Sequence, residues 1–277
     1  MEPVRAKKHL RQHFLKDENI ARKIVGSLQL VLSPPKADEG SAACPESAEG
    51  GQRIGSLLEI GPGMGVLTKY LLDLPGIDCY FIDTDREAID YLNNAFPGHE
   101  ARFIHGDYLR MNTAKIFTGP YAVIGNFPYN ISSQIFFRIL EERQNVTEVV
   151  GMVQKEVAER LAAGPGSKTY GILSVLLQAY YRIEYLFTVN ENVFVPPPRV
   201  KSAVIRLTRN DTERLDCDEE LFFRVVKTAF NQRRKTLRNS LKSFYIDYER
   251  GEILHLAGKR AEQLSVEDFV KLTRVAV

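Results

Sequence analysis

Short apolar runs alternate with amphipathic stretches through most of this 277-residue chain. Seven runs rich in Val, Ile, Leu and aromatic residues have the length of buried strands. They lie at 56–60, 78–82, 101–104, 121–124, 148–153, 182–189 and 201–208. Stretches with apolar positions three and four residues apart predict helices between the first six runs. These helices are expected near 65–74, 86–95, 133–141, 155–163 and 170–180.

Alternating strands and helices are typical of an α/β fold with a mostly parallel sheet covered on both faces. No helical pattern separates the last two runs, so we expect them to pair as an antiparallel hairpin. A further helix is expected near 17–30. After residue 209 the strand-like runs stop, and helices are predicted near 218–230, 232–244, 249–257 and 266–275. The pattern therefore predicts an α/β domain over residues 1–209 and a small all-helical domain over residues 210–277.

One segment interrupts this pattern. Residues 33–53 read SPPKADEGSAACPESAEGGQR and contain no Val, Ile, Leu or aromatic residue. Such a segment cannot bury enough apolar surface to order itself, so it is interpreted as a flexible loop insertion. The sequence assigns it no role.

The composition excludes several classes of protein. Lys and Arg number 37 and Asp and Glu number 35, and a net charge of +2 neither requires nor excludes a nucleic-acid partner. Three distant cysteines without a CxxC pair, and histidines without HExxH spacing, argue against disulfides and predict no metal site. The sequence also shows no secretory signal and no apolar run of roughly 18 residues, so we expect a cytoplasmic protein without a membrane contact.

A glycine-rich turn is the strongest local signal for a ligand. Gly61, Gly63 and Gly65 follow the run that ends at Ile60, and glycines at a strand-to-helix turn let the backbone approach a ligand closely. A dinucleotide fingerprint would need glycine at position 66, where this chain has valine. With Glu59 two residues before the turn, the segment resembles the S-adenosylmethionine loop of Rossmann-like methyltransferases. That resemblance implies that Glu59 lies under the loop and binds near the amino-acid end of the cofactor.

Carboxylates follow the next two strands. Asp83 and Asp85 end the second run and Asp107 follows the third. The carboxyl ends of parallel strands meet at the edge where open α/β sheets bind ligands. Either Asp83 or Asp85 could accept the ribose hydroxyls, with Asp85 the better candidate for a helix N-cap. Asp107 could accept a hydrogen bond from the cofactor's adenine.

The fourth run ends in Asn126, Phe127, Pro128 and Tyr129. An adenine amine is a poor nucleophile because its lone pair is conjugated into the ring. The side-chain carbonyl of Asn126 and the main-chain carbonyl of residue 127 could accept its hydrogens and favour a pyramidal nitrogen. Pro128 would stiffen the loop, and Tyr129 could stack on an extruded base. Catalysis would then rest mainly on alignment of amine and methyl group.

Six segments in all carry a resemblance to a family. Asn-Phe-Pro-Tyr resembles the N-[LI]-P-Y motif of rRNA adenine dimethyltransferases, and the others resemble the small-subunit (16S) branch, KsgA/RsmA type. These are Gln12-His13-Phe14-Leu15, which resembles Q-N-F-L, and residues 154–158, 168–171, 194–202 and 229–241. The resemblance implies a Rossmann-like class I methyltransferase domain with a mostly parallel seven-stranded sheet. It also implies S-adenosylmethionine-dependent dimethylation of two adjacent adenosines in the 3′-terminal hairpin loop of 16S rRNA.

The resemblance also implies roles for individual residues. Asn126 and Tyr129 would hold the target adenine, and Phe194 is a candidate second stacking face. The chain departs from the family at His13 for Asn, Asp83 for Glu, Phe127 for Leu or Ile and Arg11 for Gly, and we expect all four departures to be tolerated. The implied cofactor contacts are His13, Leu15, Gly61, Asp83, Asp107 and Asn126.

A basic stretch at residues 227–242 predicts phosphate contacts. It contains no acid, and Arg234, Arg238 and Lys242 recur every four residues, which would place them on one helix face. Like charges so placed repel unless an anion binds there. The candidate RNA-binding residues are Arg233, Arg234, Lys235, Arg238 and Lys242. The expected partner is 16S rRNA within the immature small ribosomal subunit, bound by a monomer.

Three other functions compete with this interpretation. A large-subunit rRNA adenine dimethyltransferase would share the cofactor domain, but segments 194–204 and 232–239 argue against it. A DNA adenine methyltransferase would usually have proline at position 127. A non-catalytic assembly factor would hold immature subunits through the basic stretch, but the intact Glu59, Gly61, Gly63, Asp107, Asn126 and Tyr129 disfavour a loss of catalysis.

Overall fold

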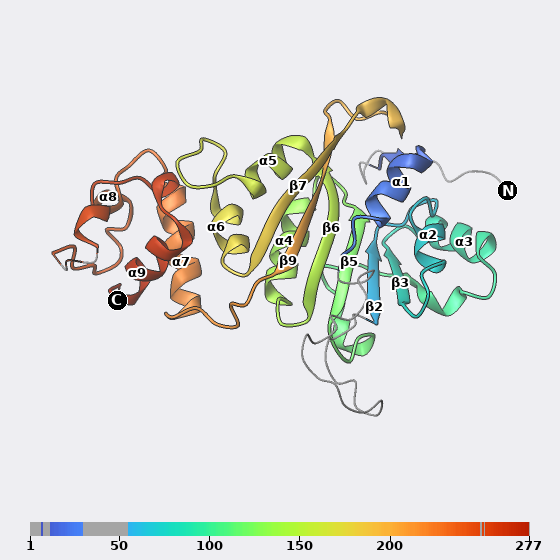
Figure 1. The fold of residues 1–277 in the computed structure, drawn as a ribbon, viewed down its shortest axis with the longest axis horizontal. Coiled ribbons are helices and arrows are strands. Elements are labelled where there is room, and N and C mark those ends of the chain that lie inside the picture. The colour runs from blue at the N-terminus through green and yellow to red at the C-terminus, as the bar shows by residue number, and fades with distance from the viewer. Residues whose placement is uncertain (1–6, 8–11, 30–54, 250, 252, 277) are drawn as a thin grey trace, which may run out of the picture.

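The computed structural model describes residues 7, 12–29, 55–249, 251 and 253–276. The predicted flexible insertion at 33–53 lies outside these residues. Within them, the predicted α/β architecture with a helical C-terminal region is confirmed (Figure 1).

A single seven-stranded sheet forms the centre of the molecule, in the order β4-β3-β2-β5-β6-β9-β7. The five strands from β4 to β6 are parallel, and β9 is antiparallel to both of its neighbours. The predicted hairpin therefore exists, although β9 inserts between β6 and β7. The strands are β2 (Ser56–Ile60), β3 (Asp78–Asp83), β4 (Phe103–His105), β5 (Tyr121–Asn126), β6 (Val146–Gln154), β7 (Tyr181–Val189) and β9 (Ser202–Arg209).

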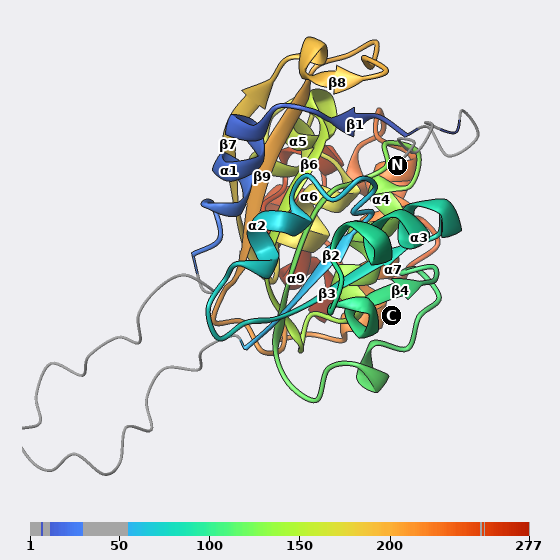
Figure 2. The same cartoon turned by 90° about the vertical axis from the view of Figure 1, so that its right-hand side faces the viewer.

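Helices cover both faces of the sheet, as Figures 1 and 2 show. On one face lie α1 (Glu18–Val25), α2 (Thr68–Leu72) and α3 (Arg86–Ala95), and on the other lie α4 (Ser132–Glu141), α5 (Lys155–Ala162) and α6 (Ile172–Gln178). Each face has its own buried apolar cluster, because the strands are apolar on both sides. The short strands β1 (Phe14–Leu15) and β8 (Phe194–Val195) pair with each other outside the main sheet.

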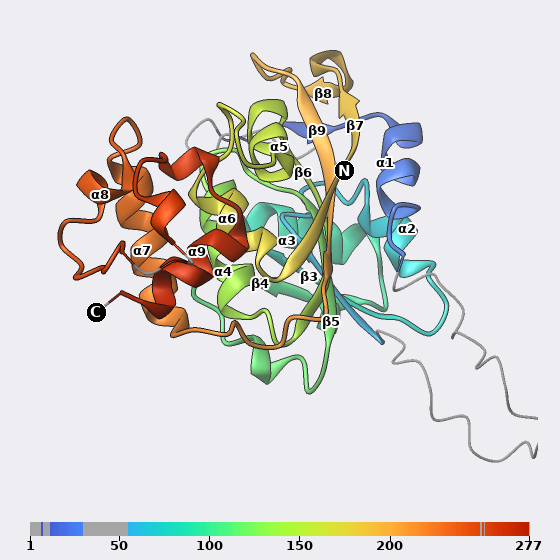
Figure 3. The same cartoon turned by 60° about the vertical axis from the view of Figure 1, so that its left-hand side comes forward.

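The C-terminal helices extend the core on the α4–α6 side (Figure 3). α7 (Glu219–Asn231) and α9 (Val266–Arg274) both contact α6, and α8 (Leu237–Ser240) packs on α7. Their apolar side chains belong to the same buried cluster as those of α4, α5 and α6. The Phe230 ring, for example, lies 6.1 Å from Tyr170 and 6.0 Å from Phe269 between ring centroids. The apolar core is thus continuous across the proposed boundary at residues 209 and 210.

Two helix predictions in this region are wrong. Residues 232–236 form a turn and only Leu237–Ser240 is helical, while the described residues of 249–257 contain one 3₁₀ turn at Leu254–Leu256. The reason is tertiary: the Leu237 N–H donates to the Lys259 carbonyl at 2.8 Å, and Thr236 forms a β-bridge with Arg260. These backbone bonds between two distant segments replace those that a longer helix would have made.

Glu219 joins the two parts of the chain. One carboxylate oxygen accepts from the Tyr180 hydroxyl at 2.9 Å and from the Leu215 N–H at 3.0 Å, and the other accepts from the Arg143 guanidinium at 2.7 Å. Arg143 and Tyr180 come from the α/β part, and Glu219 begins α7.

We expect Glu219→Ala to lower the free energy of unfolding by about 2 kcal/mol, because it leaves a half-buried guanidinium and hydroxyl without their acceptor. Urea unfolding followed by circular dichroism measures this change. Glu220→Ala, at the exposed next position, is the matched control and should shift stability by less than about 0.5 kcal/mol. Equal effects of the two substitutions would contradict this role of Glu219.

Candidate active site and nucleic-acid interface

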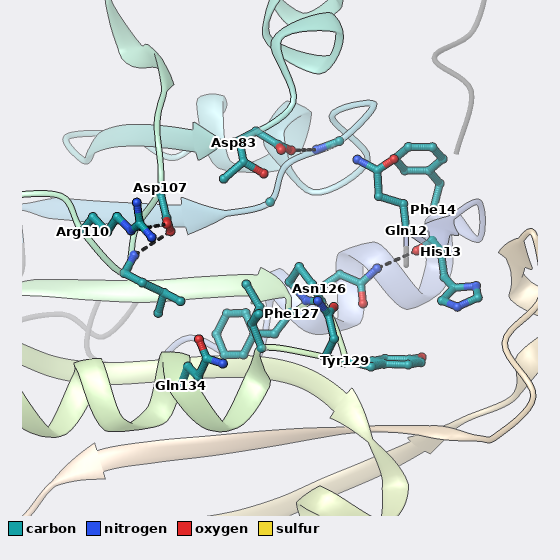
Figure 4. Close-up of a pocket in the computed structure, with 17 residues that line it drawn as sticks. Gln12, His13, Phe14, Asp83, Asp107, Arg110, Asn126, Phe127, Tyr129 and Gln134 are labelled. Atoms are coloured by element: carbon teal, nitrogen blue, oxygen red, sulfur yellow. Dashed lines mark hydrogen bonds and ion pairs between the residues drawn. The ribbon is translucent and has the colours of Figure 1, made fainter. Parts of the chain in front are cut away.

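A cavity of about 570 Å³ opens at the carboxyl ends of the parallel strands. Residues from the chain's beginning, from the loops after β2, β3, β4 and β5, and from α4 meet there (Figure 4). This is the sheet edge at which the sequence placed its glycines, carboxylates and amide. The lining residues are Gln12, His13, Phe14, Gly61, Gly63, Asp83, Thr84, Asp107, Leu109, Arg110, Asn126, Phe127, Pro128, Tyr129, Asn130, Ile131 and Gln134.

The glycine turn presents bare backbone to the cavity. Gly61 and Gly63 have φ angles of 71° and 55°, in the left-handed region that favours glycine. A Cβ at Gly63 would lie 2.8 Å from the Phe14 ring, so a side chain at this position would collide with the N-terminal segment. The predicted close approach of backbone to ligand is therefore sterically possible only with glycine here.

The structure distinguishes the two aspartates that follow β3. Asp83 lines the cavity and accepts from the N–H groups of Gly63 at 3.3 Å and Asp85 at 2.9 Å, while its burial raises the pKa of its carboxyl group. Asp85 caps α3 by accepting from the Glu87 N–H at 3.0 Å. It also accepts from Lys7 at 2.7 Å and from Gln12 at 3.2 Å. Asp83 is thus the candidate for the ribose, and Asp85 holds the N-terminal segment in place.

Asp107 lines the cavity at the end of β4. One oxygen accepts from the Leu109 N–H at 3.0 Å, and the other lies 3.6 Å from the Arg110 guanidinium. The carboxylate is half-buried and keeps lone pairs for a ligand amine.

Asn126 ends β5 at the centre of the cavity wall. Its Nδ2 donates to the main-chain carbonyl of His13 at 2.9 Å. This bond commits the NH₂ end of the amide to the N-terminal segment, so the Oδ1 end is left to accept hydrogen bonds within the cavity.

Tyr129 lies beside Asn126 in the same wall (Figure 4). Its hydroxyl bonds to the Ser202 hydroxyl at 2.5 Å, and its ring stacks on the His13 imidazole with centroids 5.5 Å apart. The His13 Nδ1 lies 2.8 Å from the Pro196 carbonyl oxygen. Two segments that are distant from Tyr129 in sequence, around His13 and around Ser202, therefore restrict the plane of the tyrosine ring.

Phe127, between the amide and the proline, is fully buried. A Cβ at Gly151 would lie 2.6 Å from its ring and a Cβ at Gly125 would lie 3.1 Å from it, so the ring fills a slot between two glycines. Its other neighbour is Phe136, at 5.8 Å between ring centroids. This slot gives the phenylalanine ring room beside the candidate catalytic amide.

Glu59 supports the glycine loop from beneath. Its side chain is 1% exposed, does not line the cavity, and accepts from the Thr68 hydroxyl at 2.7 Å. Burial raises the pKa of this carboxyl group to about 8. The structure thus places Glu59 one layer away from the cofactor contact expected of it.

Two residues expected at the site lie outside the cavity lining. Leu15 and Phe194 are 4% and 1% exposed and pair across β1 and β8, so both side chains lie in the core instead of the cavity. Their expected roles, a cofactor contact and a second stacking face, stay predictions. Sequence reasoning also missed cavity residues, although Gln12 and Phe14 flank His13, and Leu109 and Arg110 lie two and three residues after Asp107. The others are Thr84, Asn130, Ile131 and Gln134.

The predicted basic surface is rearranged. Because 232–236 is a turn, Arg234, Arg238 and Lys242 do not share a helix face as expected, although all three are exposed. The Arg233 guanidinium donates to the Lys168 carbonyl at 2.6 Å and lies 3.5 Å from Glu262, so it holds the turn in place. A hollow of about 460 Å³ lies along residues 231–235. Of the five candidate RNA-binding residues, the four exposed ones are Arg234, Lys235, Arg238 and Lys242.

Two features are absent from the part of the chain that the structure describes. No group of three or more His, Cys, Asp or Glu residues is placed to hold a metal ion. No helix there combines the length and the apolar character that crossing a bilayer requires.

Comparison with known proteins decides the family. A family model described as ribosomal RNA adenine dimethylase matches residues 4–276. The chain is 53% identical over 276 residues to "Ribosomal RNA small subunit methyltransferase A" of Parabacteroides distasonis, covering 100% of this chain and 96% of the relative. The chain belongs to the ribosomal RNA adenine dimethylase family. A protein of the same name from Flavobacterium johnsoniae is 52% identical, with 99% and 97% covered.

Solved structures of other methyltransferases share the fold of this member of the ribosomal RNA adenine dimethylase family. A dimethyladenosine transferase from Plasmodium falciparum aligns with a TM-score of 0.71 at 24% identity, covering 94% of this chain and 96% of that one. The 23S rRNA methyltransferase ErmE aligns with a TM-score of 0.67 at 22% identity, covering 94% and 99%. At these identities the alignments establish the Rossmann-like methyltransferase fold alone.

The buried Glu59 predicts a dependence of stability on pH. Its pKa is raised in the folded state, so its contribution is fully present below the unfolded pKa of 4.5 and is lost as pH rises through about 8. We expect Glu59→Gln, which keeps the Thr68 hydrogen bond, to become more stable relative to the wild type between pH 5 and 8. The difference in unfolding free energy between variant and wild type should change by at most about 1.4 kcal/mol per pH unit. Urea unfolding at both pH values measures it, and a constant stability difference would contradict a protonated Glu59.

The packing of the Phe127 ring between two glycines predicts an effect on the methyl-transfer rate. We expect Gly151→Ala to displace the ring and with it Asn126, lowering the methyl-transfer rate about tenfold while cofactor affinity changes little. Gly119→Ala is the control, since nothing lies within 4 Å of a Cβ there. Adding Phe127→Leu to Gly151→Ala should restore most of the rate. A double variant no faster than Gly151→Ala would show that the slot does not set the position of Asn126.

Proposed function

We propose that this chain transfers methyl groups from S-adenosylmethionine to the 6-amino groups of two adjacent adenosines in the 3′-terminal hairpin loop of 16S rRNA. The observation that carries the proposal is the orientation of Asn126. Its NH₂ end donates to the His13 carbonyl, which leaves its oxygen to accept a hydrogen bond in the cavity. Family membership supports the base and the reaction. The names of the most similar relatives support the small subunit as the substrate.

The cavity residues fit the cosubstrate. Asp83 is placed to accept the ribose hydroxyls, Asp107 is placed to accept the adenine amine, and the bare backbone at Gly61 and Gly63 can approach the amino-acid end. S-adenosylmethionine supplies an electrophilic methyl group on a sulfonium. Its positive charge suits a cavity whose buried edge carries these carboxylates.

The reaction requires little more than alignment. Asn126 Oδ1 and the Phe127 carbonyl accept the two amine hydrogens, which favours a pyramidal nitrogen whose lone pair is less conjugated with the ring. Tyr129 stacks on the base, a contact worth about 1–3 kcal/mol. The amine nitrogen attacks the methyl carbon, an N–C bond forms as the C–S bond breaks, and the cationic amine loses a proton to water. Repetition of these steps with a second cosubstrate completes each dimethyladenosine.

The basic surface of the C-terminal helices supports docking on RNA. Arg234, Lys235, Arg238 and Lys242 are exposed along one short segment, and such groups bind phosphates without reading sequence. We infer that this surface holds the immature small subunit while the cavity receives the extruded adenine. The protein then acts as a monomer in the cytoplasm, where the subunit matures.

Two other candidates share parts of this evidence. The fold of ErmE resembles that of this chain, so the fold itself does not separate small-subunit from large-subunit substrates. Identities above 50% to small-subunit methyltransferases, against 22% to ErmE, favour 16S rRNA. A purely structural assembly factor is disfavoured because Asn126, Asp83 and Asp107 all line an open cavity.

We expect Asn126→Ala to abolish methylation, with a loss of at least about a hundredfold, because the amine loses the acceptor that orients it. Affinity for small subunits should stay within a few-fold. The assay incubates each variant with S-adenosylmethionine and unmethylated subunits, and mass spectrometry of the rRNA digest counts and locates methyl groups. Arg234→Ala is the opposite control and should weaken subunit binding and reduce its salt dependence.

Dimethyladenosine at two adjacent positions of the 3′-terminal hairpin, made by the wild type only, is the expected result. Parallel loss of binding and methylation in Asn126→Ala would contradict the division of labour between cavity and basic surface. Methyl groups in large-subunit rRNA, or none at all, would overturn the proposed function.

A further inference from the structure

His13 contacts two residues of the cavity wall, and it uses a different group for each. Its main-chain carbonyl accepts from Asn126, while its imidazole stacks on Tyr129 with ring planes 28° apart. The family resemblance assigns the second position of the Q-N-F-L segment to the cofactor, through an asparagine. In this chain the side chain at that position is a ring.

The imidazole is tied to the wall opposite the cofactor carboxylates. Its Nδ1 lies 2.8 Å from the Pro196 carbonyl oxygen, and because a carbonyl oxygen only accepts, Nδ1 carries the hydrogen. The same chain segment holds Tyr129 a second time, through the Ser202 hydroxyl. Figure 4 shows the ring beside Tyr129, away from Asp83 and Asp107.

Through these contacts the His13 ring restricts the orientation of Tyr129. With the hydroxyl end bonded to Ser202 and the ring supported by His13, the tyrosine has little freedom to rotate. The core position of Phe194 leaves no second aromatic face from β8. The platform on which an adenine would stack is therefore Tyr129 together with the ring of His13.

We propose that the His13 side chain is a positioning residue for the target adenine and not a ligand of the cosubstrate. It holds the Tyr129 ring and connects it to the segment at Pro196, so that the base stacks with its amine near Asn126. This proposal rests on the proposed function and adds to it the residue that fixes the stacking platform.

The test separates the two halves of the cavity. For His13→Ala, His13→Phe and the wild type, calorimetry measures the affinity for S-adenosylhomocysteine. Single-turnover assays on saturating small subunits measure methyl transfer. We expect His13→Ala to slow transfer about tenfold, the usual scale of one lost stacking contact, with cosubstrate affinity within about twofold. His13→Phe keeps a ring against Tyr129 and should recover transfer to within about threefold of the wild type.

His99→Ala, a histidine outside the cavity lining, is the matched control and should leave both quantities unchanged. The proposal is overturned if the affinity for S-adenosylhomocysteine falls in parallel with the rate, if neither changes, or if phenylalanine rescues no better than alanine. A wild-type protein that binds S-adenosylhomocysteine but transfers no methyl group would overturn the proposed function itself, and the proposal with it.

Discussion

The hydrogen bond from Asn126 to the His13 carbonyl is the constraint on which the site depends. A side-chain amide can present either its oxygen or its NH₂ group, and only the oxygen can draw hydrogens from an adenine amine. The bond joins residues 113 positions apart, so it exists only while the N-terminal segment stays in place. Asp85 anchors that segment through Lys7 and Gln12, and the pairing of β1 with β8 fixes its other end.

The sheet divides the two recognition tasks between its two kinds of strand. The parallel strands β2, β3 and β4 lead into the glycine turn, Asp83 and Asp107, which form the half of the cavity proposed for the cosubstrate. The antiparallel β9 begins at Ser202, which bonds to Tyr129, and so brings the wall of the base half against the same edge. Asn126, at the end of β5 between the two halves, is where the methyl donor and the amine would meet.

The local pattern of apolar and polar residues in the sequence predicted much of this arrangement. The seven strands, the hairpin and the three carboxylates could be predicted because each depends on hydrophobic period and on residues just after a strand. The choice between Asp83 and Asp85 was open in sequence and is decided by the contacts of Lys7 and Gln12. The helix expected at 232–244 is wrong, while the expected roles of Phe194 and His13 stay predictions. All three depend on contacts with a distant segment, around Lys259, Leu15 or Pro196 respectively, which local sequence does not show.

The most direct test of this account is a crystal structure of the protein with S-adenosylhomocysteine and an RNA hairpin that carries the target adenines. The account predicts the adenine amine about 3 Å from Asn126 Oδ1 and the base stacked on Tyr129. The Asn126 Nδ2 should still donate to the His13 carbonyl. A base held elsewhere, or an amide whose nitrogen faces the adenine amine, would contradict it.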